Sequence, residues 1–379
     1  MHIILIPDSF KGTFSSEQVI HYIREGFEHH FDDVTFDEVP IADGGEGTVD
    51  SIVSALRGEK HLALVRDSLG RLIEASFGMC GRTAIIEMAE SSGITKISSK
   101  ERMPLLTSTY GVGEMILEVL KHDTDEIIIG IGGSATNDGG TGMLQALGVR
   151  FFDESGEILE QGGQILKRIR RIDASGIPEE LKKIPITVMC DVSNPLTGPK
   201  GATMIYGPQK GANDKTLLEL EAGMVNYKKI LLETVGIDVD LIDGAGAAGG
   251  LGAALVSFLG AKLKPGIEVI LDLVSFDSMV SNADLVITGE GKIDAQSIYG
   301  KVPVGVAGRC LDFNVEVIAL VGTEGDQSKV VYDHGINAIV STIAGVISEE
   351  DLTLNAEKRI KESIENLCRL LKIGMKLNK

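Results

Sequence analysis

The amino-acid sequence predicts an α/β protein in which a discontinuous, doubly wound domain carries a large inserted domain. Residues 1–62 and 283–379 alternate strand-like and helix-like segments, whereas residues 63–282 begin with consecutive short strand-like runs. In the alternating parts, loops that combine glycine with acidic side chains follow the strand-like runs. We therefore assign residues 1–62 plus 283–379 to one domain and residues 63–282 to a second, mixed α/β domain. The active site is expected in the cleft between them.

The composition is that of a two-domain protein and argues against several kinds of partner. The chain has 379 residues, a net charge of −19 and no tryptophan. An acidic protein with few aromatic residues is poorly suited to nucleic acid or anionic membranes. It can still bind small anions where Mg²⁺, lysine side chains and helix N-termini create local positive potential. We expect small-molecule substrates and a monomer or homodimer.

The cysteines and the first residues indicate a cytoplasmic protein. The four cysteines are scattered and form no C-x-x-C motif, and no histidine pair has zinc-ligand spacing. The opening sequence MHIILIPDSF lacks the basic segment that precedes the apolar part of a signal peptide. The longest uncharged run is too short and too rich in glycine to be a convincing membrane span.

The N-terminal segment predicts two repeats of strand, polar loop and helix. Residues 2–6 and 34–39 are the strands, and Ser15 or Ser16 caps the first helix. The apolar positions that define the two helices are Val19, Ile20, Ile23 and Phe27, then Val49, Ile52, Val53 and Leu56. The loops 7–13 and 42–48 therefore lie at carboxyl ends of strands, where open α/β sheets bind ligands.

The middle of the chain predicts an antiparallel sheet followed by mixed elements. The strand-like runs are His61–Val65, Ile73–Phe77 and Thr83–Met88. Further along we expect a helix capped by Thr107–Thr109, a hairpin at 150–160, a strand at 186–189 and a long helix at 214–233. The C-terminal elements are strands at 284–288, 315–321 and 338–341, a helix opened by Lys301, and an amphipathic helix within 351–371.

The sequence EIIIGIGGSATNDGGTGMLQALG at 126–148 is the clearest candidate for a binding loop. Three isoleucines end in a glycine-rich polar loop, and a helical pattern begins at Met143. Glycine lets the backbone approach a ligand closely, and a helix N-terminus offers unpaired N–H groups to an anion. The alternative is a tight structural turn. We interpret the loop as a phosphate or carboxylate site formed by Gly132, Gly133, Ser134, Thr136 and Asn137.

Five loops combine glycine with a polar side chain. Together they could supply the groups that phosphoryl transfer requires. They surround Asp8, Asp43, Asn137, Asp191 and Glu290. Phosphoryl transfer uses backbone N–H groups and lysines on phosphates, carboxylates on Mg²⁺, and an aspartate near the acceptor hydroxyl. The candidate phosphate cations are Lys11 and Lys301, although each could be an ordinary surface lysine. Neither the G-x-x-x-x-G-K-[ST] motif nor the protein-kinase motifs occur.

Residues 244–249 match the dinucleotide-binding pattern G-x-G-x-x-G. Glu268 or Asp272 lies about twenty residues further on, as a dinucleotide site requires. The preceding residues, IDVDLID, make a poor buried strand. We therefore favour close helix packing, or a second anion loop, over nicotinamide binding.

Several segments, in order along nearly the whole chain, resemble the type 1 glycerate kinases. They are PDSFKGT at 7–13, ADGGEGT at 42–48, TSTYGVGE at 107–114, GIGGSATNDGGTGMLQALG at 130–148, CDVSNPLTG at 190–198, GPQKGA at 207–212, GAGAAGGLGAAL at 244–255 and ITGEGKIDAQSIYGKVP at 287–303. The resemblance implies ATP-dependent phosphorylation of D-glycerate with Mg²⁺, to 2-phosphoglycerate or to the 3-phosphate. It also implies a Rossmann-like domain closed from the two chain ends.

We assign roles on the basis of this chemistry. Asp191 accepts the proton of the acceptor hydroxyl or orients that hydroxyl, and Asp8 is a second catalytic candidate. Lys11 and Lys301 neutralise phosphate oxygens. Asp43 and Asn194 contact substrate. Glu290 and Asp294 are the candidates for Mg²⁺.

Two functions of other classes remain open at this point. One is an NAD-linked dehydrogenase of hydroxy acids, and the other is a non-catalytic protein that binds glycerate or a nucleotide.

Overall fold

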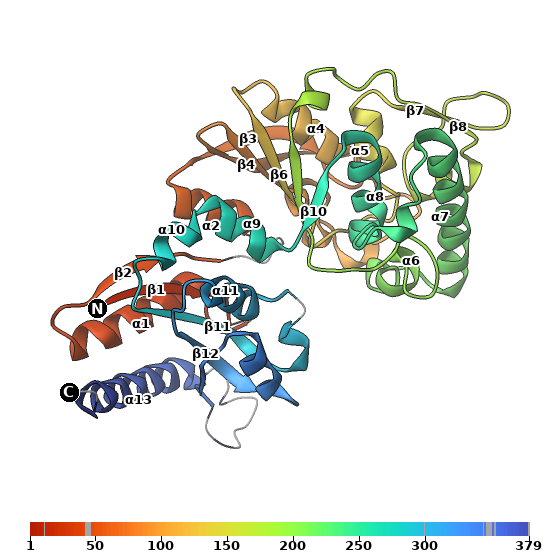
Figure 1. Cartoon of the computed structure of the whole chain (residues 1–379). Helices are drawn as coiled ribbons and strands as arrows, with labels where there is room; N and C mark the ends of the chain where they lie inside the picture. Colours follow the sequence, from red (N-terminus) through yellow and green to blue (C-terminus); the bar gives the residue numbers. More distant parts are fainter. Residues whose placement is uncertain are drawn as a thin grey trace. The chain divides into compact units, whose positions relative to one another are not determined.

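The computed structural model describes residues 1–10, 12–41, 47–298, 300–343, 345, 351 and 354–377. The chain forms two compact units of α/β structure, which confirms the predicted class (Figure 1). Unit 1 comprises Met1–Asp43, Ser54–Leu56 and Ile267–Lys379, and unit 2 comprises Gly44–Val53 and Arg57–Gly266.

Unit 1 resumes at Ile267, whereas the sequence predicted that the first domain resumes at residue 283. Helices α9 (Gly266–Leu273) and α10 (Phe276–Val280) belong largely to unit 1. The reason is the guanidinium of Arg309 on α11 (Val302–Leu311), which forms ion pairs with three carboxylates of that segment, Glu268, Asp272 and Asp277. The segment is therefore tied to the C-terminal part of the chain by side chains that are distant in sequence.

Unit 1 is built on a five-stranded parallel sheet with the order β13-β12-β11-β1-β2. Its strands are β1 (His2–Pro7), β2 (Thr35–Glu38), β11 (Leu285–Ile293), β12 (Val317–Glu324) and β13 (Ala338–Ser341). In chain order this is 2-1-3-4-5, so the strand order reverses beside β1 and β11. Ligands of open α/β sheets bind at such a reversal, beyond the carboxyl ends of the strands.

Two helices, α1 (Ser16–His30) and α13 (Ala356–Leu377), pack together in unit 1 (Figure 1). Ser15 is the N-cap of α1, and its side chain and that of Gln18 form a capping box, as one of the two predicted serines should. Gly26 permits the close approach of the helices, because a Cβ there would lie 2.4 Å from Cγ2 of Ile364. The apolar positions predicted for α1 are all buried.

Unit 2 contains a mixed six-stranded sheet with the order β10-β9-β6-β5-β4-β3. The predicted antiparallel strands are present as β3 (Glu59–Arg66), β4 (Leu72–Cys80) and β5 (Thr83–Glu87). From β5 onward the pairing is parallel, through β6 (Glu126–Gly130), β9 (Ile186–Met189) and β10 (Lys262–Lys264). The carboxyl ends of these four parallel strands therefore lie at one edge of the sheet.

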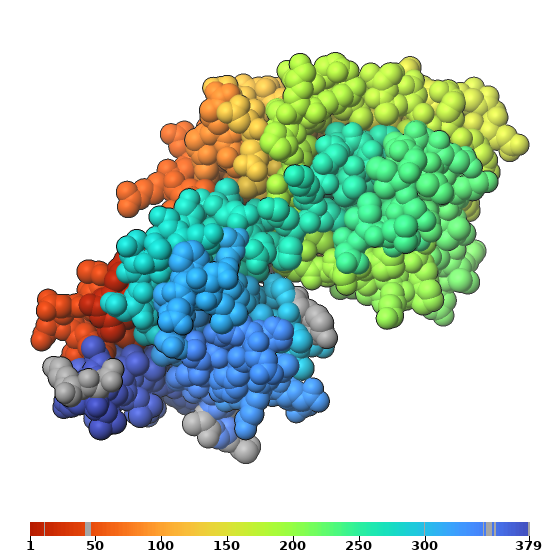
Figure 2. All heavy atoms as spheres, in the orientation of Figure 1, coloured from red at the N-terminus to blue at the C-terminus, as the bar shows by residue number. Residues whose placement is uncertain are grey.

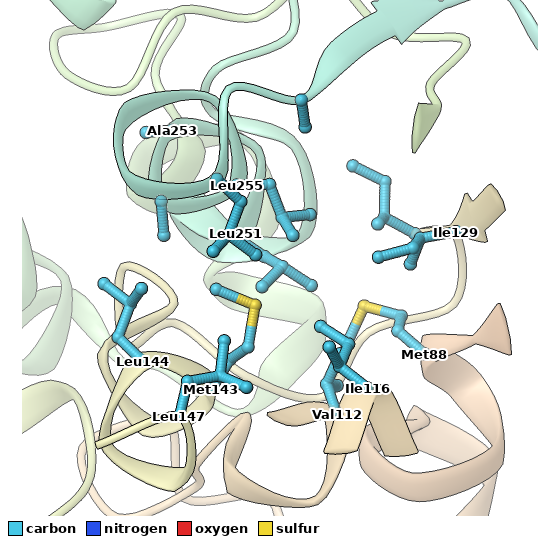
Figure 3. Close-up of a cluster of buried hydrophobic side chains, with 14 of the residues drawn as sticks. Met88, Val112, Ile116, Ile129, Met143, Leu144, Leu147, Leu251, Ala253 and Leu255 are labelled. Carbon is cyan, nitrogen blue, oxygen red and sulfur yellow. The ribbon is translucent and has the colours of Figure 1, made fainter. Parts of the chain in front are cut away.

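Five helices of unit 2 contribute to one continuous apolar core: α3 (Met88–Ser92), α4 (Tyr110–Val119), α5 (Thr141–Ala146), α7 (Asp214–Val235) and α8 (Ala247–Leu259). Helix α6 (Ala202–Tyr206) also lies in unit 2, and α2 (Thr48–Leu56) has residues in both units. Figure 3 shows Ile116, Ile129, Met143 and Leu251, from four different elements, meeting in this core. Helix α7 packs its buried face on the core, and its other face lies at the molecular surface (Figure 2).

Two local predictions are confirmed only in part. The chain does reverse within residues 150–160, where the N–H of Leu159 donates to the carbonyl of Phe151 and a bridge joins Phe152 to Ile158. The extended pairing of β7 (Arg150–Phe152), however, is with the distant β8 (Arg171–Asp173). Within the predicted capping segment 107–109, the hydroxyl of Ser108 accepts a hydrogen bond from the N–H of Tyr110, the first residue of α4, whereas Thr109 makes no side-chain capping bond to the helix. Its hydroxyl is used in a contact with Asp138 instead.

Candidate active site

Polar groups lie where three of the parallel strands end, at the carboxyl edge of the unit 2 sheet. The register pairs Glu87 with Gly130 and Gly130 with Met189, so the chain leaves β5, β6 and β9 at the same level. Glu87 is the last residue of β5, the residues 130–140, which we call the glycine loop, continue from the end of β6, and Asp191 follows β9. The sheet thus brings together groups that are separated by up to about a hundred residues in the sequence.

Only the first part of the glycine loop reaches the surface. Gly132 is half-buried, Gly133 is exposed with a φ of 71°, and Ser134 is 8% exposed. Among the described residues, none accepts a hydrogen bond from the N–H groups of Gly132, Gly133 or Ser134. These three residues keep their backbone donors available, as the predicted anion site requires.

Thr136 and Asn137 lie beneath the surface. Both are fully buried, and Nδ2 of Asn137 donates to Oγ1 of Thr203 over 3.1 Å. Their predicted contact with a ligand does not fit this position, because neither residue has any exposed surface. Within the described part of the chain, Thr136 Oγ1 and Asn137 Oδ1 are buried oxygens without a hydrogen-bond partner. The two residues support the loop from below.

The N–H groups at the start of α5 are occupied by a side chain of the protein itself, the carboxylate of Asp138. The carboxylate of Asp138 is fully buried and accepts hydrogen bonds from the N–H groups of Gly140 and Gly142, each over 3.1 Å. It also accepts from the N–H and hydroxyl of Thr109, over 2.8 and 2.9 Å. The sequence-based expectation that this helix start receives a ligand anion is therefore replaced by internal capping.

A buried lysine anchors the glycine loop, although it is not among the site residues predicted from the sequence. Lys210 is 2% exposed, and its Nζ donates to Ser134 Oγ and to the carbonyl of Thr136, each over 2.6 Å. Burial lowers the pKa of Lys210 to about 7, although the nearby Asp138 carboxylate raises it. The segment GPQKGA contains this lysine, and its position between glycines is the signal that could have identified it.

Asp191 lies where the chain leaves β9, and its side chain is held by the backbone. The residue is exposed, and its Oδ1 accepts a hydrogen bond of 2.7 Å from the N–H of Gly266. Asn194, three residues on, is used internally, since Nδ2 donates to the carbonyl of Lys200 and Oδ1 accepts from the hydroxyl of Tyr206. Asp191 is therefore the better placed of the two to meet a substrate.

Glu87 is a second buried titratable group at this edge. The residue is 2% exposed, and its carboxylate accepts hydrogen bonds from the N–H groups of Gly47 and Val49 at the start of α2. Burial raises the pKa of Glu87 to about 7, against these two hydrogen bonds. Glu87 is not among the site residues predicted from the sequence, although a carboxylate that directly ends an apolar strand is a usable signal.

We expect Glu87 to make stability depend on pH. A carboxyl group with a raised pKa stabilises the fold below pH 4.5, and that contribution is lost as the pH rises through about 7. The stability of wild type relative to Glu87→Gln should therefore fall by about 2–3 kcal/mol between pH 4.5 and 8. Urea unfolding at several pH values measures it. Glu90→Gln is the control, because hydrogen bonds from Ser76 and Lys96 outweigh burial and lower the pKa of Glu90. A pH-independent difference for Glu87→Gln would contradict the prediction.

In unit 1, the predicted residues gather where the strand order reverses. The register pairs Pro7 with Gly289, so Asp8 and Glu290 follow side by side, and the N–H of Asp8 donates to the carbonyl of Gly289 over 2.8 Å. Glu290 is 6% exposed and accepts hydrogen bonds from Ser297 Oγ over 2.6 Å and Lys301 Nζ over 3.0 Å. Burial raises the pKa of Glu290 despite these contacts.

The residues predicted to bind Mg²⁺, Glu290 and Asp294, supply two carboxylates. Asp294 contacts Lys292 over 3.2 Å, and its charge is near enough to contribute to the raised pKa of Glu290. Across the described ranges, no group of three or more His, Cys, Asp or Glu side chains is arranged to hold a metal ion. Such a pair fits Mg²⁺ only in the manner of nucleotide enzymes, in which phosphates and water complete the coordination.

Two predicted site residues, Lys11 and Asp43, lie outside the described residues. No described helix is both long and apolar enough to span a membrane.

The G-x-G-x-x-G match at 244–249 is a packing device. The residues before it form a 3₁₀ turn, Val239–Leu241, instead of the strand that a dinucleotide site requires. A Cβ on Gly246 would lie 2.1 Å from the carbonyl oxygen of Pro195, and one on Gly249 would lie 2.1 Å from that of Thr136. Gly249 also accepts a hydrogen bond from Gly139. The segment thus packs closely against the buried side of the glycine loop, in agreement with the predicted packing role.

Gly249→Ala is expected to destabilise unit 2 by at least about 3 kcal/mol. Gly249 has a φ of 68°, and an added methyl group would meet the backbone of Thr136 and Asn137. Gly236→Ala is the matched control, because Gly236 has a similar φ of 74° but nothing within 4 Å of the added carbon. Chemical denaturation should give a clearly smaller loss for the control. Equal losses would show that backbone strain alone, without close packing, explains the glycine.

Similarity to known proteins extends over the whole chain. Residues 3–372 match the model of the glycerate kinase family. The chain is 44% identical to a glycerate kinase of Halalkalibacterium halodurans, with 97% of each chain covered. It is 43% identical to a glycerate 2-kinase of Escherichia coli K12, with 99% of each covered. A crystal structure of a provisionally named glycerate kinase 2 from Salmonella typhimurium LT2 matches with a TM-score of 0.88 at 41% identity, over 99% of both chains.

Proposed function

The chain belongs to the glycerate kinase family, and we propose that it transfers the γ-phosphoryl group of ATP to the 2-hydroxyl of D-glycerate. The products are ADP and 2-phosphoglycerate. The observation that carries the proposal is the match over almost the full length of both chains to a relative named glycerate 2-kinase. The carboxyl edge of the unit 2 sheet, which carries available N–H donors in the glycine loop and an exposed aspartate after β9, supports it.

Asp191 is the group that we propose to act on the acceptor hydroxyl. The oxygen of that hydroxyl forms a bond to the γ-phosphorus, the bond between this phosphorus and the bridging oxygen of ADP breaks, and the proton passes to the Asp191 carboxylate. The hydrogen bond from Gly266 orients the carboxylate for this role. In a loose phosphoryl transition state, such orientation contributes more than a strong base would.

The exposed part of the glycine loop holds an oxyanion in this proposal. Gly132, Gly133 and Ser134 offer backbone N–H groups to phosphate oxygens of ATP or to the carboxylate of glycerate. Thr136 and Asn137 support these residues without contacting the ligand.

In unit 1, we propose that Asp8, Glu290 and Lys301 serve the phosphates and their cation. Lys301 neutralises phosphate charge once its pairing with Glu290 is exchanged for a ligand. Glu290 and Asp294 would hold Mg²⁺ together with phosphate oxygens, and the metal would supply positive charge to the transferring group. Lys11 and Asp43 remain candidates for contacts with phosphate and substrate.

A coupled assay tests the function. ADP formation that requires both D-glycerate and Mg²⁺-ATP is the expected result, and phosphorus NMR of the product should show the 2-phosphate. A 3-phosphate product would refute the position of transfer while leaving the kinase activity in place. NADH formation without ATP would point to the dehydrogenase, and stabilisation by glycerate without turnover would point to a binding protein. The packing role of residues 244–249 argues against the dehydrogenase.

A further inference from the structure

The ammonium group of Lys210 determines what Ser134 can do. Lys210 ends the 3₁₀ turn Pro208–Lys210 and reaches under the glycine loop, which lies more than seventy residues earlier in the chain. An ammonium group has donors and no acceptor, so Ser134 Oγ must accept in the 2.6 Å contact between them. A serine hydroxyl has a single proton, and this proton remains for Ser134 to donate elsewhere.

The same ammonium group also fixes the backbone on the far side of Ser134. Its second hydrogen bond, again 2.6 Å, goes to the carbonyl of Thr136. The two contacts hold the loop at two points, two residues apart, while Gly132 and Gly133 extend toward solvent. Next to Lys210, Gly211 has a φ of 95° and its Cα faces the carbonyl of Arg102, where a Cβ would lie 2.2 Å away. The lysine is therefore placed by a backbone geometry that glycine alone permits.

We propose that Lys210 is a positioning residue that makes Ser134 an obligate hydrogen-bond donor and orients the Gly132–Ser134 backbone toward an oxyanion. The ligand is a carboxylate or a phosphate group, and it receives the Ser134 hydroxyl proton together with the backbone N–H groups. Lys210 does not touch the ligand, but its charge lies one hydroxyl group away from it. This inference rests on the proposed function, because it concerns the same loop.

Protonation of Lys210 should therefore control affinity. In the free protein the pKa of Lys210 is lowered to about 7 by burial, and among the described residues the charged group that acts on it is Asp138. A bound oxyanion stabilises the ammonium form, so binding should be tightest below pH 7 and should weaken as the pH rises above it. A lysine with a purely structural role would not produce this dependence.

Isothermal titration calorimetry with D-glycerate alone and with ATP alone tests the proposal. Between pH 6 and 8.5, wild type should lose at least about tenfold affinity for one of the two ligands. Lys210→Met should bind that ligand weakly at both pH values. Ser134→Ala should lose most of the dependence, and the double variant should be no weaker than Lys210→Met, since Lys210 acts through Ser134. Thr203→Val, which removes the partner of Asn137 but leaves Lys210 in place, should retain the pH dependence.

The outcomes separate the two ligands and the two hypotheses. A change for glycerate assigns the loop to the carboxylate, and a change for ATP assigns it to phosphate. Equal affinities at both pH values in wild type, or an unaltered pH dependence in Ser134→Ala, would overturn the proposal even if Lys210→Met failed to fold. Binding is measured without turnover. If the wild-type protein shows no glycerate-dependent ADP formation, the kinase function is rejected, but the binding result still stands.

Discussion

Asp191→Asn is expected to lower kcat by about 10²–10³-fold while changing the KM for ATP by less than threefold. Asparagine keeps the size of the side chain and an oxygen that can accept from the N–H of Gly266, so the loop geometry should persist. What is lost is the charge that receives the hydroxyl proton. Steady-state measurement of ADP formation against both substrates gives kcat and the two KM values.

The control for this variant is Asp214→Asn, which removes an exposed carboxylate from the first turn of α7 in the same unit. It should leave kcat within about twofold of wild type, since surface changes far from a site have small effects. Wild-type kcat in Asp191→Asn would reject the role of Asp191 in proton transfer. A lower kcat with an equal rise in the KM for glycerate would indicate that Asp191 binds the hydroxyl instead.

The elements that could be predicted are those whose stability is local or whose burial is complete. Helix α1 was recognisable because Ser15 caps it and its apolar positions repeat with helical spacing. The parallel strands were recognisable as uninterrupted apolar runs, such as Ile127–Ile129, because both faces of a parallel sheet are covered. The positions of Asp8 and Asp191 followed from these strands, since polar residues just after a parallel strand lie at the edge where ligands bind. Glu290 was expected in a loop after a strand at 284–288, but β11 continues to Ile293 and contains it.

The parts that could not be predicted depend on contacts between distant segments. Nothing near Arg150 shows that its strand pairs with residues 171–173 in addition to the segment after the following turn. Lys210 looks like a surface lysine in sequence, and only the fold brings it beneath Ser134. The same holds for the helix start at residue 141, where a ligand anion and the Asp138 carboxylate are equally plausible from the pattern and the burial of Asp138 decides between them.

Asp138→Ala is expected to lower the free energy of unfolding of unit 2 by about 4 kcal/mol or more. The carboxylate accepts four hydrogen bonds, from the N–H groups of Thr109, Gly140 and Gly142 and from the Thr109 hydroxyl, and the residue is fully buried. Removing it leaves these donors without a partner and without access to water. Burial raises the pKa of Asp138, although the four hydrogen bonds favour the ionised form.

Asp153→Ala is the matched control, because Asp153 organises a turn in the same way but at the surface. Its carboxylate accepts from the N–H groups of Ser155 and Glu157 and from the Ser155 hydroxyl. Water can replace it there, so the expected loss is below about 1 kcal/mol. Urea unfolding followed by circular dichroism compares the two variants. Similar losses would mean that the glycine loop is held by Lys210 and the packing of Gly249 alone. A large loss only in Asp138→Ala would show that the loop needs its own buried anion before it can present N–H groups to a ligand.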